Sequence, residues 1–336
     1  MTQLLTLLHS SIVFGTVIMF GALGEIISEK AGNLNLGVPG IMYLGAIAGL
    51  CGPYFYELSC AEAGTTPSGA VCILISIVCA FAASALGGLI YSFLTITLRT
   101  NQNVTGLTLT IFGGGVANFF GGSLNVFAGG VGQVKATATT AAFTKYSFTL
   151  SALGANADGK GIGYLLFQHG FLTYVAVIFA VLIHLFLMKT RTGLNLRAVG
   201  ENPGTADAAG INVARYKYLA TCIGAGISGL GGLYYTMNYI GGTWANDGTI
   251  EALGWLAVAL VIFATWRSLN ALWGAYVFGI FYWMYQYIGV SGRAIELFKM
   301  LPYLVTLALL ITVSMRRRKE DQPPAHLGLP YFREER

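Results

Sequence analysis

The chain has few charged side chains. Asp, Glu, Lys and Arg make up 10% of its 336 residues, whereas 55% are hydrophobic and the mean hydropathy is +0.66. No Asp, Lys or Arg stands at the centre of its long apolar segments. Carriers driven by protons or sodium usually have ionisable side chains at those depths. This absence argues against such a carrier, although a stand-alone secondary transporter or channel stays open as an alternative.

Cysteine and histidine are scarce and scattered. The five cysteines form no C-x-x-C pair and the four histidines lie far apart in the chain, so no metal or redox site is expected. No set of Ser, His and Asp is apparent, and no pair of carboxylates is expected on one helix face. An enzyme is therefore the least favoured class, and no catalytic residue is predicted.

Two segments imitate nucleotide-binding motifs without meeting their requirements. Residues 154–161 approach a P-loop, but Gly161 stands where a Ser or Thr must reach magnesium. Residues 224–229 match a dinucleotide-binding pattern, yet they lie inside an apolar segment that cannot form the required strand-to-helix turn. No ATP site and no cofactor are expected on this chain.

Long apolar runs fill most of the sequence and predict membrane-spanning helices. We expect an all-α polytopic membrane protein with about nine transmembrane helices, eight or ten being possible, in a single domain over residues 1–315. The predicted spans are 4–27, 38–56, 70–98, 104–120, 164–188, 218–240, 253–266, 269–288 and 298–315. Small residues at Ala80, Ser84 and Gly88, and at Ala225 and Gly229, are expected to let these helices pack closely.

The positions of the basic residues predict the orientation. Segment 189–217 carries five Lys and Arg residues between two apolar runs, and the tail 316–336 begins with four more. The positive-inside rule places both in the cytoplasm. The N-terminus and a loop over residues 121–163 then lie outside. The net charge of +5 reflects topology and lipid headgroups, and no nucleic-acid partner is expected.

Segment 189–217 has an internal pattern of its own. Asn202-Pro203 starts a turn, Gly204 or Thr205 can cap a helix, and residues 206–209 favour a short helix that stops at Gly210. The pattern predicts a small helix outside the bilayer, suited to a groove on another protein. The alternative is an ordinary loop that only fixes topology.

Four asparagines are candidates for lining a solute path: Asn33, Asn35, Asn118 and Asn238. Asn33 and Asn35 flank Leu34 beside a glycine-rich helix start, which predicts irregular backbone satisfied by side-chain amides. The alternative for each is a hydrogen bond between helices.

Two motifs carry a family resemblance. The first is A-L-G-E-I-I-S-E-K-A-G-N-L-N-L-G over residues 22–37, and the second is L-R-A-V-G-E-N-P over residues 196–203, followed by Ala206, Gly210 and Lys217. Together they resemble the inner-membrane permeases of the simple-sugar and nucleoside branch of ABC importers. The resemblance covers most of residues 20–315.

The resemblance implies a translocation subunit in a bacterial inner membrane. It implies an ATPase partner that holds ATP and magnesium, a second permease that is a copy or a paralogue, and an extracytoplasmic binding protein or lipoprotein. The expected cargo is a nucleoside or related sugar-containing solute, with a monosaccharide as the alternative. The residues implied to couple to the ATPase are Arg197, Gly200, Glu201, Asn202, Pro203, Ala206 and Gly210.

Overall fold

The computed structural model describes residues 2–130, 134–145, 165, 167–289, 292–316 and 322–333. Within these ranges the regular structure is entirely helical, as the apolar runs predicted. The elements are α1 (Thr2–Lys30), α2 (Val38–Glu62), α3 (Gly69–Ser92), the π-helix η1 (Phe93–Thr97), α4 (Gln102–Phe127), α5 (Thr137–Lys145), α7 (Phe171–Lys189), α8 (Arg191–Glu201), α9 (Pro203–Ala208), α10 (Val213–Tyr234), the π-helix η3 (Tyr235–Tyr239), α11 (Thr249–Phe263), α12 (Ser268–Ile288), α13 (Ala294–Lys299) and α14 (Leu301–Arg316).

The expected count of about nine membrane spans is not confirmed. Within the described ranges, six helical segments are long and apolar enough to cross a bilayer: Gln3–Lys30, Val38–Glu62, Gly69–Thr97, Gln102–Phe127, Phe171–Lys189 and Ala294–Thr312. Helix α11 has 15 residues and covers roughly 22 Å, less than the ~30 Å hydrocarbon core. Helices α10 and α12 are longer, but their glycines, tyrosines and polar residues dilute the apolar signal.

The predicted outer loop over residues 121–163 contains more helix than expected. Helix α4 continues to Phe127 and α5 covers Thr137–Lys145. A composition rich in Gly, Ala and Thr had predicted a loop here. The segment that imitates a P-loop lies outside the described residues.

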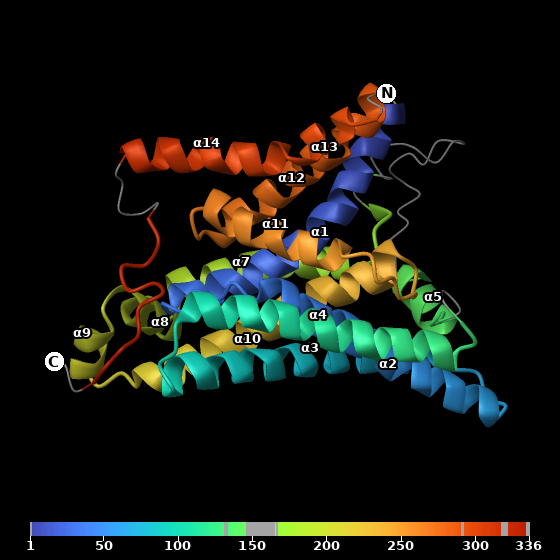
Figure 1. Cartoon of the computed structure of the whole chain (residues 1–336), viewed down its shortest axis with the longest axis horizontal. Helices are drawn as coiled ribbons and strands as arrows, with labels where there is room; N and C mark the ends of the chain where they lie inside the picture. The colour runs from blue at the N-terminus through green and yellow to red at the C-terminus, as the bar shows by residue number, and fades with distance from the viewer. Residues whose placement is uncertain are drawn as a thin grey trace.

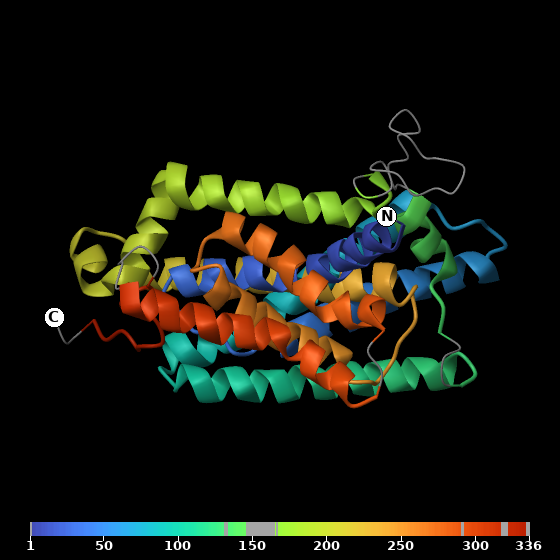
Figure 2. The ribbon, with the colours of Figure 1, turned by 90° about the horizontal axis from the view of Figure 1, so that it is seen from above.

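Helices α1 and α10 form the centre of the bundle. Helix α1 packs against α10, α11 and α12, while α10 also packs against α2 and α3. Figure 1 shows α8, α9 and the C-terminal residues gathered at one end of the bundle, with the N-terminus and α5 at the other. Figure 2 shows α7 along the opposite edge of the bundle from α4. The end that carries α8 and α9 is called the coupling end below.

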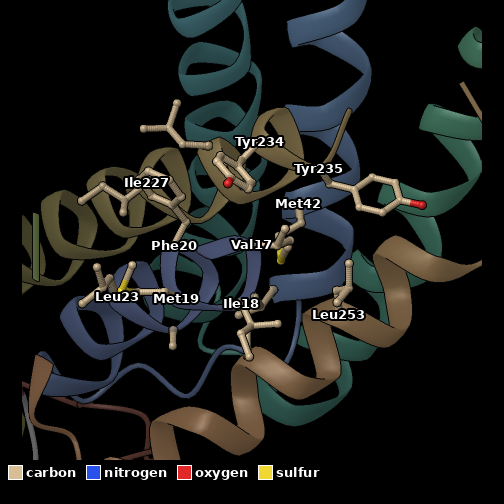
Figure 3. Close-up of a cluster of buried hydrophobic side chains, with 14 of the residues drawn as sticks. Val17, Ile18, Met19, Phe20, Leu23, Met42, Ile227, Tyr234, Tyr235 and Leu253 are labelled. Carbon is tan, nitrogen blue, oxygen red and sulfur yellow. The ribbon is translucent and has the colours of Figure 1, made fainter. Parts of the chain in front are cut away.

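A continuous apolar cluster joins the central helices. Figure 3 shows Val17, Ile18 and Phe20 of α1 beside Met42 of α2 and Leu253 of α11, and all five are buried. Side chains of this size dominate packing because each buries a large apolar area. The same cluster places Tyr234 and Tyr235 at the junction between α10 and η3.

Glycines bring α2, α3 and α10 into backbone contact. A Cβ atom at Gly232 would lie 1.9 Å from the Met42 carbonyl oxygen, and one at Gly45 would lie 2.3 Å from the Gly229 carbonyl oxygen. A Cβ atom at Gly88 would lie 2.6 Å from the Ala225 Cβ. The predicted close packing through small residues is confirmed, because no side chain fits between these helices.

Gly232→Ala tests this packing. The added methyl meets a backbone carbonyl that cannot rotate away, so we expect a loss of about 1–3 kcal/mol in unfolding free energy. The matched control is Gly122→Ala on α4, where nothing lies within 4 Å of the added Cβ atom. Thermal unfolding in detergent measures both variants. Equal stability of the two would contradict this account of the α2–α10 contact.

Candidate coupling surface

Three side-chain caps shape the basic segment 189–217. Thr190 Oγ1 accepts the Gly193 N–H at 3.0 Å at the start of α8. Asn202 Oδ1 accepts the Thr205 N–H at 3.0 Å at the start of α9, and Asn212 Oδ1 accepts the Arg215 N–H at 2.9 Å at the start of α10. Each cap satisfies a backbone donor that has no partner within its helix. The chain therefore turns sharply three times within about 25 residues.

The predicted short helix is confirmed as α9, which begins at Pro203 and ends at Ala208. The cap is Asn202, not Gly204 or Thr205, and Gly210 leaves the helix with a φ of +84°. Helix α8 was missed, because Gly193 and Gly200 lower its helix propensity. The sequence pattern that could have predicted α8 is the helical spacing of Gly193, Leu196, Val199 and Gly200, which are its buried residues.

The predicted coupling residues divide into three groups by exposure. Gly200, Pro203 and Ala206 are buried, Arg197 is half-buried, and Glu201, Asn202 and Gly210 are exposed. Ala206 packs with Val199 and Val213 in a small apolar cluster beneath α9. The exposed residues and half-buried Arg197 are accessible to a partner, while the buried residues fix the position of α9.

Gly200 connects the coupling surface to α1. A Cβ atom at Gly200 would lie 2.3 Å from the Lys30 carbonyl oxygen and 3.1 Å from the Gly32 nitrogen. Helix α8 therefore contacts the end of α1 through bare backbone. Gly32 has a φ of +85° and turns the chain away from α1 at this point.

The chain between α1 and α2, residues 31–37, is called the α1–α2 turn. Its N–H groups find side-chain acceptors inside the protein: Glu25 Oε1 for Asn35 at 3.0 Å, Gln102 Oε1 for Leu34 at 2.7 Å, and Asn35 Oδ1 for Gly37 at 3.0 Å. The irregular backbone predicted here is confirmed, and one of these acceptors is the Asn35 amide. Non-helical backbone is tolerated in a membrane protein where protein groups satisfy it.

The carbonyl groups of the α1–α2 turn are bound from two other helices. Tyr91 of α3 donates its hydroxyl to the Leu34 oxygen at 2.5 Å, and Thr110 of α4 donates to the Leu36 oxygen at 3.0 Å. Asn33 donates its amide to Thr221 Oγ1 of α10 at 2.8 Å. The turn thus joins α3, α4 and α10 at one point.

Two buried carboxylates lie beneath the turn, contrary to the expectation that no carboxylates would pair on one helix face. Glu25 and Glu29 are one helical turn apart on α1, and each is at most 3% exposed. Glu25 accepts the Asn35 N–H, and Glu29 accepts the indole N–H of Trp266. The spacing of four residues between Glu25 and Glu29 could have indicated that they share one helix face. Their donors indicate a role in holding the turn and the α11–α12 connection.

The four predicted path residues are not brought together. Asn33 and Asn35 lie in the α1–α2 turn at the coupling end. Asn118 is 16 residues into α4, roughly 24 Å from its start. Asn238 lies in η3 beyond the far end of α10. The Oδ1 atoms of Asn118 and Asn238 are buried without a hydrogen-bond partner among the described residues.

The tail residues 322–333 cover part of the coupling surface, which sequence reasoning missed. The His326 N–H donates to the Gly200 carbonyl at 3.0 Å, and the Gly328 N–H donates to the Gly32 carbonyl at 3.3 Å. Tyr331 donates its hydroxyl to Asp207 Oδ2 at 2.9 Å, and Arg333 pairs with the same atom at 3.2 Å. The tail therefore binds α8, α9 and the α1–α2 turn together.

Two further contacts complete the tail interface. The Ala325 N–H donates to Glu201 Oε2 at 3.3 Å, and the Arg99 guanidinium lies 4.6 Å from the centre of the Phe332 ring. Burial, followed by the charge of Lys217, lowers the pKa of His326. A neutral ring is therefore favoured where the tail crosses Gly200.

Comparisons with known proteins identify the family to which this chain belongs. The family described as a branched-chain amino acid transport system permease component matches residues 7–310. The chain belongs to this permease family. The guanosine ABC transporter permease NupQ of Bacillus subtilis is 29% identical over 341 residues, covering 97% of this chain and 96% of the relative. No solved structure matches the chain.

Two further relatives support the same class. A putative glucose ABC transporter permease of Haloferax volcanii is 33% identical over 279 residues, covering 82% of this chain and 75% of the relative. A nucleoside ABC transporter permease of Lactococcus lactis is 27% identical over 310 residues, covering 89% of each chain. This chain is a multi-pass plasma-membrane permease subunit of an ABC importer, and its role is translocation, not catalysis.

Asp207→Ala tests the tail interface. The substitution removes a charged acceptor shared by Tyr331 and Arg333, an interaction class of about 1.5–3 kcal/mol. We expect amide hydrogen exchange in residues 325–329 of the permease to accelerate about tenfold or more. The control is Glu296→Ala, which removes an exposed carboxylate paired with nearby Lys299. Unchanged exchange in Asp207→Ala would contradict a tail held at α9.

Proposed function

We propose that this permease moves nucleosides, or related sugar-containing solutes, into the cytoplasm on energy delivered by a partner ATPase at the coupling end. The observation that carries the proposal is the backbone contact between Gly200 and the end of α1. A force applied to α9 passes to α8 and then to membrane helix α1 through that contact. No flexible side chain stands between α8 and α1 there. The partner supplies ATP and magnesium, and the permease supplies the path.

The exposed face of α9 suits a partner groove. Asn202, Thr205 and Ala208 are exposed, while Pro203 and Ala206 are buried against the permease. Small side chains allow a close fit, and the buried pair keeps the helix from turning. Glu201 accepts the Ala325 N–H of the tail. The tail is therefore part of the surface to which Arg197 and Glu201 contribute.

A second permease completes the transporter in this proposal. Helix α4 exposes apolar side chains along its length, including Val104, Ile111, Phe119 and Val126. A membrane helix with this surface contacts lipid or another subunit. The extracytoplasmic binding protein would deliver solute at the opposite end from α9.

The proposed solute path passes the π-helix η3. Stretches of π-helix are often found at functional sites, and η3 carries Asn238 between two tyrosines. The Tyr235 and Tyr239 rings stack with centroids 5.3 Å apart, and in Figure 3 the Tyr235 hydroxyl points away from the other labelled side chains. Aromatic rings and an amide oxygen that has no partner among the described residues are suited to a solute that has both a flat base and hydroxyl groups.

The names of two relatives that align with most of this chain support nucleosides. One relative that covers 97% of the chain is named for guanosine, and one that covers 89% is named for nucleosides. The relative with 33% identity is named for glucose, which keeps a monosaccharide as the second candidate. Competition of labelled nucleoside uptake by unlabelled nucleosides and by unlabelled glucose separates the two, with strong competition by nucleosides expected.

Gly200→Ala tests the coupling contact. The added methyl meets the Lys30 carbonyl at 2.3 Å, and overpacking of this kind costs about 1–3 kcal/mol. We expect ATP-driven uptake to fall about tenfold while ATP hydrolysis by the assembled transporter continues. Gly204→Ala is the control, because its Cβ atom would meet only Asn202 Oδ1 at 3.5 Å. Normal uptake by Gly200→Ala would overturn the proposed transmission.

Asn238→Leu tests the path. Loss of a hydrogen bond to the solute costs about 1 kcal/mol, so the nucleoside concentration for half-maximal uptake should rise about fivefold. The control is Asn103→Leu, an exposed asparagine at the start of α4. An unchanged concentration dependence in Asn238→Leu would remove this residue from the path.

A further inference from the structure

A polar cavity of about 350 Å³ lies at the coupling end, between membrane helices and α8. Its walls come from the end of α1, from α7, from α8 and from the connection between α11 and α12. The lining residues include Lys30, His184, Arg197, Trp266, Arg267 and Ser268. The proposed transport mechanism assigns no occupant to this cavity.

The lining is rich in hydrogen-bond donors. Helix α12 begins at Ser268 and runs for 21 residues, so backbone N–H groups without helical partners lie at this wall. Ser268 is 2% exposed, and its hydroxyl has no hydrogen-bond partner among the described residues. The Nε atom of Arg197 is likewise buried without a partner there. A buried donor without an acceptor costs about 1–3 kcal/mol, a penalty that a bound acceptor removes.

The charge of the lining has one sign in excess. Lys30, Arg197 and Arg267 are cationic and Glu201 is the single carboxylate. Glu201 also accepts the Ala325 N–H from the tail. The positive end of the α12 dipole adds to this field.

We propose that this cavity binds a phosphate group. The oxygens of a phosphate group can accept from an arginine, a lysine, a hydroxyl and a helix N-terminus together. A carboxylate has two oxygens and would leave more donors unpaired than a phosphate monoester, which has three free oxygens. Leu187, Met188, Trp266 and Gln322 also line the cavity, which leaves room for the organic part of a phosphate monoester, either a soluble compound or phosphatidic acid.

The site connects elements that the transport cycle must move. A phosphate bound there contacts α8 through Arg197, the end of α1 through Lys30 and the start of α12 through Ser268. It therefore reinforces the contact between α8 and α1 that Gly200 makes directly. Binding is a property of the permease itself and does not depend on which solute is transported.

The test is calorimetric titration of the full-length permease in phosphatidylcholine nanodiscs, with inorganic phosphate and then methyl phosphate as probes. We expect saturable binding that Arg197→Gln weakens about tenfold or more and Ser268→Ala weakens about threefold or more. The control is Arg191→Gln, which removes an exposed arginine of α8 outside the cavity. Size-exclusion chromatography of each variant verifies that the fold is retained.

The outcomes separate the possible sources of the anion. Competition between added phosphate and phosphatidic acid in the nanodisc would support the site with a lipid phosphate monoester as its ligand, and its absence would support a free phosphate compound. No saturable binding in phosphatidylcholine would overturn the proposal. Loss of the ATPase partner from Arg197→Gln, without any phosphate binding by the parent chain, would also overturn it in favour of a partner's acidic side chain.

Discussion

The buried backbone of the α1–α2 turn sets the constraint on which the coupling end depends. Peptide groups that leave the helix inside the protein need partners there, because each unsatisfied group costs several kcal/mol. Glu25, Gln102, Tyr91 and Thr110 supply those partners from α1, α4 and α3. Three helices must therefore be in place before the turn is stable, and the turn then fixes the end of α1 on which Gly200 packs.

This constraint explains why the proposed energy-coupling region consists of small residues and backbone. Gly200 meets Lys30 and Gly32 without a side chain, and Ala206 and Pro203 fill the space beneath α9. Contacts of this kind transmit displacement because no side chain stands between the two backbones that could absorb the movement by changing its rotamer. The tail adds hydrogen bonds from His326 and Gly328 to the same two elements. The coupling end is thus one assembly, although its parts are separated by more than a hundred residues.

Sequence reasoning succeeded where the signal was local. Asn202-Pro203 and Gly210 mark the limits of α9, and the asparagines beside Leu34 indicate an irregular turn, because caps and breakers act within a few residues. It failed where the cause was tertiary. Gly193 and Gly200 made α8 difficult to predict, because glycine has a low helix propensity. Their role is to allow close contacts with Phe186 and Lys30, which the local sequence pattern does not reveal. The tail's partner Asp207 is 124 residues from Tyr331. The expected count of about nine spans is not confirmed, because six helices of the described residues are long and apolar enough to cross a membrane.

The central claim is that α9 and the α1–α2 turn move as one body when the ATPase partner closes. Pulsed electron paramagnetic resonance on the assembled transporter, with spin labels at Thr205 of α9 and Leu36 of the turn, measures this directly. The account predicts one narrow distance distribution that is the same in the ATP-free and ATP-trapped states, while the distance from Thr205 to a label on Glu62 changes. A Thr205–Leu36 distance that shifts between the two states would contradict the account.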